Sequence, residues 1–139
     1  MKMLRSALLA FGLLACTLAQ ASEAQKIEQA KAAASAWLAI ADNEDYLRSW
    51  QQAASLFRHS VTRYDWTNLA VDLRSPLGPV RARTLQSAKY ATQLPGLPDG
   101  EYVILEYRSN FEHHSEAVET VTPMRDTDGQ WRVAGYYVD

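Results

Sequence analysis

A glutamate with arginines within reach is the first group in this sequence that could do chemistry. Glu119 has valine neighbours in a segment of alternating pattern, so we expect its carboxylate to be partly buried. A buried carboxylate needs a cationic partner. Three arginines on neighbouring segments could provide it: Arg81, Arg83 and Arg108. The resulting pair would be either an ordinary cross-strand ion pair or an ion pair that orients a ligand.

Asp65 is the nearest candidate for an acid or base in an apolar cavity, where burial would move its pKa towards the working pH. Its spacing after Thr62 is explained equally by a capping arrangement at the start of a helix. No serine stands in a nucleophile motif, and the sequence has no glycine-rich phosphate loop. We therefore predict no catalytic residue, while an enzyme remains an alternative.

Two adjacent histidines, His113 and His114, are the nearest approach to a metal site. In a strand they would face opposite sides, and on a loop they could share a metal with Glu112 and Glu116. A solvated turn explains the pair as well, so we predict neither a metal nor a cofactor. His59, near a predicted helix end, is expected to be structural.

Aromatic residues at helical or strand spacing could line a pocket or form the core. The set consists of Trp37, Trp50, Trp66, Tyr107 and Tyr136. Our candidate ligand-binding residues are taken from this set and from the charged residues above: Trp37, Trp50, Trp66, Tyr107, Glu119, Arg83 and Arg108.

Three helices are predicted to position these aromatic residues. Apolar residues recur at helical spacing from Ala24 to near Ala41, and again through Tyr46 or Leu47, Trp50 and Phe57. A third helix opens at Thr62 and stops at Pro76 and Gly78, with a stripe of Trp66, Leu69, Ala70 and Leu73. Each helix has one tryptophan on its apolar stripe, which indicates that the helices cover a shared surface.

After Gly78 the pattern becomes that of strands. Four are predicted, over Val80 to Thr92, Glu101 to Phe111, Glu116 to Arg125 and Gln130 to Val138. The connections are rich in proline, glycine and aspartate, which favours antiparallel hairpins. The predicted fold class is α+β, with three N-terminal helices packed on a curved antiparallel sheet of about four strands. The outer sheet face has a mixed character, so it is either solvated or paired with another copy.

The first residues have the pattern of an export signal. Lys2 and Arg5 precede the apolar run from Ala7 to Leu18, and Ala19-Gln20-Ala21 is a small-x-small cleavage site. The run is shorter than the about twenty residues of a permanent membrane anchor. We predict a signal peptide over residues 1–21 and one α+β domain over residues 22–139.

A second type of processing is possible at Leu13-Leu14-Ala15-Cys16, which looks like a bacterial lipobox. In that case Cys16 would be lipidated and the protein anchored in the envelope, whereas simple cleavage releases it into the periplasm. Cys16 is the sole cysteine of the chain, so cleavage at Ala21 leaves no thiol for a disulfide.

The charge balance disfavours a nucleic-acid partner. The chain has a formal net charge of -2, and removal of Lys2 and Arg5 takes it from -2 to -4. There is no basic run outside the signal, so no nucleic-acid role is expected.

Several runs resemble a bacterial family of small exported proteins known as a domain of unknown function, DUF number 4019. The sheet motifs are Leu94 to Val103, Ala117 to Thr122 and Asp128 to Tyr136, and the helical ones include Trp37-Leu38, Tyr46, Trp50 and Arg74 to Gly78. The resemblance covers nearly the whole mature chain. It implies a layout similar to the nuclear-transport-factor-2-like, or cystatin-like, superfold, which hosts enzymes and binding modules alike.

The function predicted from these observations is a non-catalytic module of the periplasm or envelope that binds a small apolar ligand or a protein partner. It is expected to form a homodimer through the open sheet face. Two alternatives remain, a small isomerase or hydrolase with a carboxylate in its cavity and a lipidated structural protein of the envelope.

Overall fold

A computed structural model describes the backbone of residues 6–139 and the side chains of residues 22–139. Within that range the chain forms four α-helices, one short 3-10 helix and four strands. This is an α+β arrangement, as predicted. The predicted signal sequence, including the side chain of Cys16, lies outside the described side chains.

The four strands form one antiparallel sheet in the order of the sequence, β1-β2-β3-β4. Their bounds are β1 Val80–Ala91, β2 Tyr102–Phe111, β3 His114–Arg125 and β4 Trp131–Val138. Each lies within one or two residues of its predicted range. β3 starts at His114, so the polar connection after β2 is shorter than the sequence indicated.

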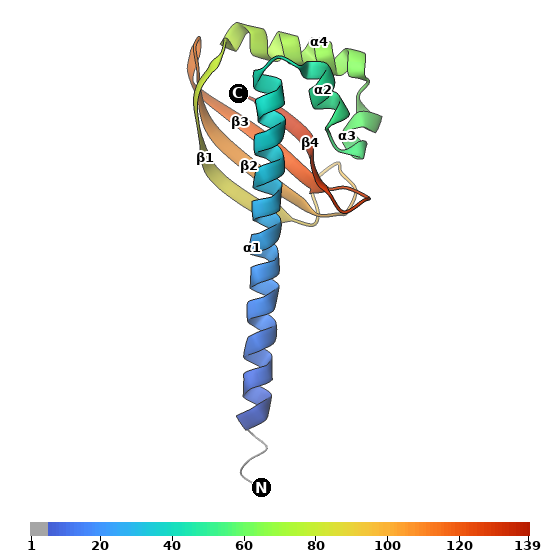
Figure 1. Cartoon of the computed structure of the whole chain (residues 1–139), viewed down its shortest axis with the longest axis vertical. Coiled ribbons are helices and arrows are strands. Elements are labelled where there is room, and N and C mark those ends of the chain that lie inside the picture. Colours follow the sequence, from blue (N-terminus) through green and yellow to red (C-terminus); the bar gives the residue numbers. More distant parts are fainter. Residues whose placement is uncertain (1–5) are drawn as a thin grey trace.

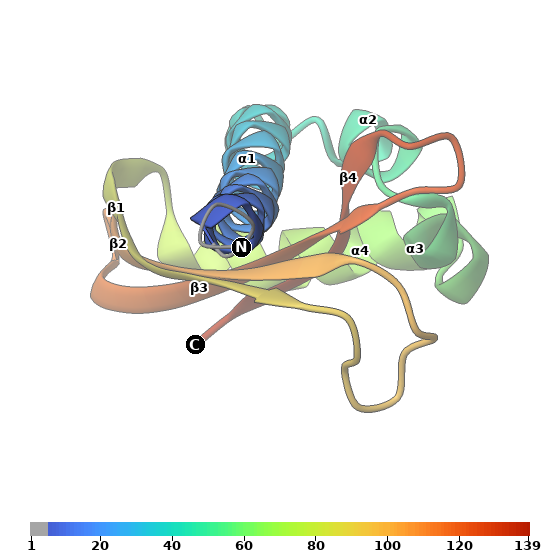
Figure 2. The same cartoon turned by 90° about the horizontal axis from the view of Figure 1, so that it is seen from below.

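The long first helix, α1 (Ser6–Asp42), contacts all four strands, and only its C-terminal part lies across one face of the sheet (Figures 1 and 2). Its buried positions recur at helical spacing within the predicted range, and they are Ala30, Ala34, Trp37, Leu38 and Ala41. Three of these are alanines, whose small side chains let the helix backbone approach the strands. α1 ends at Asp42, which places that carboxylate at one end of the helix–sheet interface.

The region predicted as the second helix contains two short helices, α2 (Tyr46–Gln51) and α3 (Ser55–Ser60). The break lies at Ala54, whose backbone is extended and whose N–H donates to the carbonyl of Val133 on β4 (2.8 Å). Asp126 then accepts hydrogen bonds from both the backbone N–H and the hydroxyl of Ser55. Contacts with β4 and with the β3–β4 connection therefore replace helical hydrogen bonds that the periodicity of this segment predicted.

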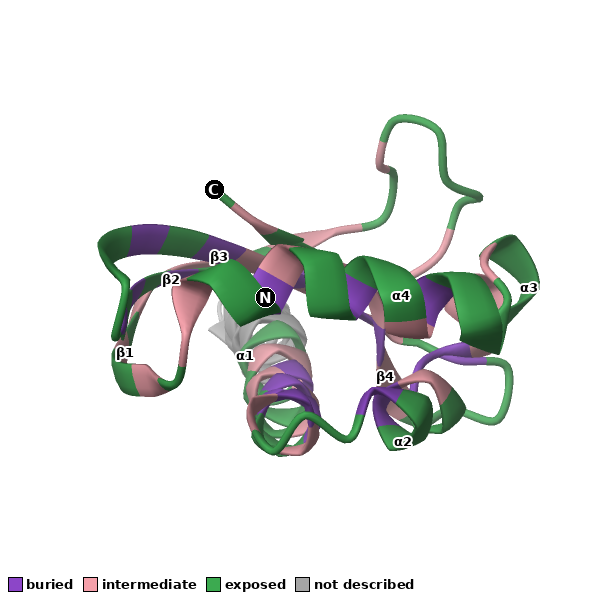
Figure 3. Cartoon of the chain, turned by 90° about the horizontal axis from the view of Figure 1, so that it is seen from above, coloured by how far each residue is buried: buried purple, intermediate pink, exposed green. Residues whose placement is uncertain are grey.

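The last helix, α4 (Arg63–Arg74), continues into the 3-10 helix η1 (Ser75–Leu77). Its buried side chains are Trp66, Ala70 and Arg74, spaced by four residues (Figure 3). Leu69, which the sequence placed on this stripe, is 49% exposed. A charged residue thus occupies the buried position at the end of the helix.

Burial alternates along β2, where Val103, Leu105 and Tyr107 face the helices and Glu106 and Arg108 face away. The apolar core fills the space between the inner face of the sheet and the helices α1, α2 and α4. Among the described residues, no helix is long and apolar enough to cross a membrane.

Candidate functional site

Glu119 is fully buried on β3, facing the helices. Its oxygen Oε1 accepts hydrogen bonds from Nε of Arg83 (2.7 Å) and the hydroxyl of Ser109 (2.6 Å). Its oxygen Oε2 accepts from the hydroxyl of Tyr136 (2.5 Å) and from a terminal nitrogen of Arg74 (3.4 Å). Four donors from four different elements therefore surround this carboxylate.

Asp42, the last residue of α1, joins the same two arginines from the other side. Its Oδ1 accepts from Arg74 (2.6 Å) and Arg83 (3.0 Å), and its Oδ2 accepts from Arg83 (2.8 Å). Arg83 therefore holds Asp42 through both terminal nitrogens, the two-pronged geometry that makes arginine–carboxylate pairs strong. We call Asp42, Arg74, Arg83 and Glu119 the charged cluster.

Opposite charges and hydrogen bonds favour the ionised forms of Asp42 and Arg83. Burial on its own would raise the pKa of Asp42, but the hydrogen bonds and charges of Arg83 and Arg74 outweigh it and lower that pKa. Burial opposes the charge of Arg83, yet its two carboxylate partners raise its pKa above the ordinary value. Burial and the negative charge of Glu119 raise the pKa of Tyr136, so its phenol stays protonated and donates.

This arrangement ties elements together and leaves little freedom for proton transfer. A general base needs an accessible lone pair within reach of a substrate proton. The two oxygens of Glu119 already accept four hydrogen bonds in a site closed to solvent. The charged cluster connects the end of α1, the end of α4, β1 and β3. Its two arginines and two carboxylates have formal charges that cancel.

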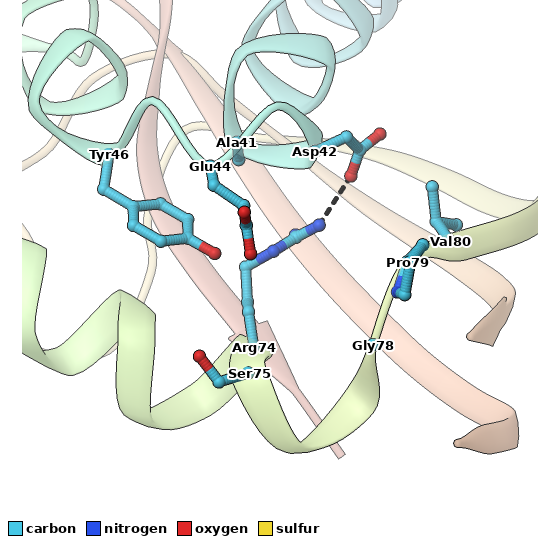
Figure 4. A pocket seen from close by; sticks show the side chains of 9 residues that line it. All are labelled: Ala41, Asp42, Glu44, Tyr46, Arg74, Ser75, Gly78, Pro79 and Val80. Atoms are coloured by element: carbon cyan, nitrogen blue, oxygen red, sulfur yellow. Dashed lines mark hydrogen bonds and ion pairs between the residues drawn. The ribbon is translucent and has the colours of Figure 1, made fainter. Parts of the chain in front are cut away.

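A pocket of about 170 Å³ opens beside the charged cluster, where α1, α4 and the start of β1 converge (Figure 4). Asp42 and Arg74 form part of its wall, and Glu44, Tyr46 and Ser75 contribute the remaining polar side chains. Glu44 has a positive φ of 60°, a conformation that residues with a Cβ rarely adopt. Apolar contacts come from Ala41, Pro79 and Val80.

The arginines that the sequence offered as partners for Glu119 have separate locations. Arg83 contacts Glu119 directly. Arg81 is exposed and pairs with Glu112 at 3.4 Å. Arg108 lies on the outer face, opposite Val118, and contributes nothing to the charged cluster.

The aromatic candidates belong to the core. Trp37 and Trp66 are each 3% exposed and Tyr107 is 8% exposed, while Trp50 is partly buried. The indole N–H groups are satisfied internally: Trp37 donates to the carbonyl of Ser49, Trp66 to its hydroxyl, and Trp50 to the carbonyl of Val61. These side chains therefore pack in the core and do not line a ligand cavity, which was the other possibility for them.

The weaker candidates lie at the surface. Asp65 is exposed and its backbone N–H donates to the hydroxyl of Thr62, which is the capping arrangement. His59, His113 and His114 are exposed. Within residues 22–139 no group of three or more metal-ligating side chains comes together.

Sequence reasoning missed four members of the site, which are Asp42, Arg74, Ser109 and Tyr136. Of these, Tyr136 was named only among the aromatic residues that could line a pocket or form the core. A signal for Arg74 existed, because it continues the four-residue spacing from Trp66 through Ala70. Ser109 also stands at an inward position of β2 between Tyr107 and Phe111. A polar residue at an inward position predicts a buried partner.

Comparison with known families assigns the chain. Residues 33–136 match the model of a family described as a protein of unknown function (DUF4019). The chain belongs to the DUF4019 family. The matched range contains the whole charged cluster and the three tryptophans of the helices, so both are part of the DUF4019 domain. No curated protein matches the chain.

Proposed function

We propose that this DUF4019 protein is an exported, non-catalytic module that binds a protein partner through the outer face of its sheet, and that the first such partner is a second copy. The observation that carries the proposal is the complete burial and hydrogen bonding of Glu119. The carboxylate of Glu119 is fully buried, and both its oxygens accept hydrogen bonds from side chains of the fold. With the aromatic residues packed as core, the surface is what remains for recognition.

The outer face consists of Glu106 and Arg108 on β2, Val118 and Thr120 on β3, and Tyr137 on β4. Register places Arg108 opposite Val118, and Thr120 between Glu106 and Tyr137. Tyr137 is 59% exposed and Val118 is 44% exposed, so this face presents apolar side chains to the solvent beside its charged ones. Tyrosine and arginine are enriched in protein interfaces.

Charge on this face supports a second copy as the occupant. Glu106 and Arg108 stand two residues apart on the same side of β2. A twofold axis through that strand would set Glu106 of one copy opposite Arg108 of the other, so the patch is self-complementary, as an isologous dimer requires. Such pairing favours orientation and association rate more than raw affinity.

Analytical ultracentrifugation of the chain from Ser22 onwards tests the proposal. We expect a dimer that Tyr137→Lys shifts to a monomer, while Leu69→Lys on the exposed side of α4 leaves it dimeric. Arg108→Glu is expected to weaken the dimer, and the double variant Glu106→Arg with Arg108→Glu to restore it. A monomer at every concentration, or equal effects of Tyr137→Lys and Leu69→Lys, would refute it.

We propose export to the periplasm on the strength of the basic, apolar and small-x-small pattern of residues 1–21. Lipidation at Cys16 is the alternative. Intact mass of the protein from cells separates the two types of processing, because a chain beginning at Ser22 without added mass excludes an acylated Cys16.

A helix that crosses a curved antiparallel sheet also supports placing the fold in the nuclear-transport-factor-2-like superfold.

A further inference from the structure

We infer that a groove between α1 and the free edge of β4 binds a short extended peptide of uncharged residues, which lies along β4 as a further strand. β4 runs beside α1 in the fold (Figure 1). This edge groove has one wall on α1 and one at the start of β4, and its defining residues are Ala32, Ala33, Ala36, Gln130, Trp131 and Val133. It lies on the side of the sheet that the helices cover, so the inference does not rest on the proposed outer-face interface.

The backbone of β4 points into this groove. β4 is the last strand in the sheet order, so one of its sides has no neighbouring strand. On that side the carbonyl of Val133 accepts from the N–H of Ala54 (2.8 Å). The N–H and C=O of a strand residue point the same way, as do those of the residue two positions along. Because the register with β3 has no shift from Trp131 to Val133, the backbone groups of Trp131 also face the free side.

Most of these edge groups have no partner. Val133 is 1% exposed, yet within residues 22–139 its N–H has no acceptor, and the N–H and C=O of Trp131 make no hydrogen bond on the free side. A buried N–H without a partner is rare and costly. The chain itself pairs with this edge once, at Ala54, and leaves the adjoining positions open. The groups that would complete the edge are alternating carbonyls and N–H groups, which a peptide backbone provides.

The dimensions of the edge groove fit an extended chain. It consists of two hollows of about 270 and 370 Å³ that share Ala33, Gln130 and Trp131. The residues of α1 that line it run from Gln29 to Ile40, a length of about 16 Å at the rise of an α-helix. About five residues of a strand span that length. The small alanine side chains of the α1 wall leave room for the side chains of the peptide.

The charge of the edge groove favours a neutral occupant. Among the described residues that line the two hollows, Arg132 alone is charged, and Asp128 holds it through two hydrogen bonds of 2.7 and 2.8 Å. The other polar side chains are the amides of Gln29, Gln52 and Gln130. Amides can donate to and accept from peptide groups without any charge. A charged side chain would lose water in the groove without gaining an opposite charge.

The test is an NMR titration of the labelled protein with three capped pentapeptides. The first alternates threonine and valine, the second has glutamate in place of threonine, and the third is the first peptide methylated on every amide nitrogen. We expect the first to shift the amides of residues 29–40 and 130–133 and to move the N–H of Val133 downfield, as a new hydrogen bond does. The glutamate peptide should bind at least about tenfold more weakly. The methylated peptide, which has no N–H for the carbonyl of Trp131, should show no binding.

A matched pair of variants locates the site. Ala36→Trp fills the edge groove and should weaken the first peptide at least about tenfold. Ala39→Trp places the same side chain at an exposed position of α1 outside the groove, and should leave the affinity unchanged. Amide spectra with native dispersion show that both variants fold, and the comparison of the three peptides uses the unaltered protein, so it decides the inference without them.

Four outcomes would overturn the inference. They are no shift with the threonine–valine peptide, equal affinity for the three peptides, full affinity of a folded Ala36→Trp variant, and shifts confined to the outer-face residues 106–108 and 118–120. The last outcome would place the peptide on the opposite side of the sheet.

Discussion

The buried stripe of α4 has an aromatic end and a charged end, and the two are held in different ways. At the aromatic end Trp66 packs against Phe57 at 5.0 Å and Trp37 at 5.9 Å between ring centroids. At the other end Arg74 enters the charged cluster. Apolar burial is non-directional and tolerates repacking, whereas buried charges are stable only when every member is paired.

Tyr136 joins the two regions. Its ring lies 5.4 Å from that of Trp37 and its hydroxyl donates to Glu119. The comparison teaches that one interface between helices and sheet is built on two principles, hydrophobic packing and mutual ion pairing. The first two variants below each affect one of them, and the last two test a backbone conformation and an ion pair outside both regions.

The largest effect is expected for Glu119→Ala, which should lower the free energy of unfolding by about 3–5 kcal/mol. The variant leaves Arg74 and Arg83 with one carboxylate for two guanidinium groups. Urea denaturation measures the change. Glu116→Ala, at an exposed position of the same strand, should stay within about 0.5 kcal/mol of the wild type. A loss no larger than that of Glu116→Ala would mean that Glu119 does not hold the cluster together.

At the aromatic end, Trp66→Phe should cost about 2 kcal/mol, because it removes core volume and the hydrogen bond from the indole to Ser49 (2.9 Å). Thermal and urea denaturation report it. Leu69→Ala, three residues along the helix and 49% exposed, is the control with a small expected effect. If Trp66→Phe proved more damaging than Glu119→Ala, the two regions would have to be ranked in the opposite order.

Glu44→Gly should raise the free energy of unfolding by about 1 kcal/mol, since glycine adopts positive φ without strain. Glu44→Ala keeps the Cβ and should leave stability near the wild-type value. Urea denaturation of the three proteins side by side separates the causes. Equal stabilisation by both substitutions would assign the effect to the lost charge and not to the backbone.

The smallest effect concerns Glu101, whose hydrogen bond with Lys26 is the main cause that lowers its pKa to about 2. Because the folded pKa lies below the unfolded one, the stabilisation is complete above about pH 4.5 and is lost as the pH falls towards 2. Glu101→Gln should therefore destabilise by under about 1 kcal/mol at pH 7, after allowance for solvent screening.

Urea midpoints at pH 7 and pH 3 check the prediction for Glu101. The difference between wild type and Glu101→Gln should shrink at the lower pH. A difference that grows towards pH 3 would contradict the sign of the pKa shift.

Much of the fold could be predicted because hydrophobic periodicity is a local property. The alternation along Tyr102–Phe111 and the stripe that contains Trp37 both appear in the structure as expected. The break between α2 and α3 could not be predicted, because it depends on Val133 and Asp126, which are distant in sequence from Ala54 and Ser55.

The candidate site was predictable in part. That Glu119 would be buried with an arginine follows from its apolar neighbours, and Arg83 was among the three candidates. Asp42 lies at the end of α1, Arg74 lies at the end of α4, and Tyr136 lies on β4. Their meeting is a consequence of packing, which no spacing along the chain expresses.

By itself, the sequence determined the α+β class, the four strands and the burial of the aromatic stripes, because these depend on patterns repeated over a few residues. Tertiary structure alone decided that Asp42, Arg74, Arg83 and Glu119 form one neutral unit with an open pocket beside it. The physical reason is that charges separated by many residues interact only after the chain has folded and excluded water from between them.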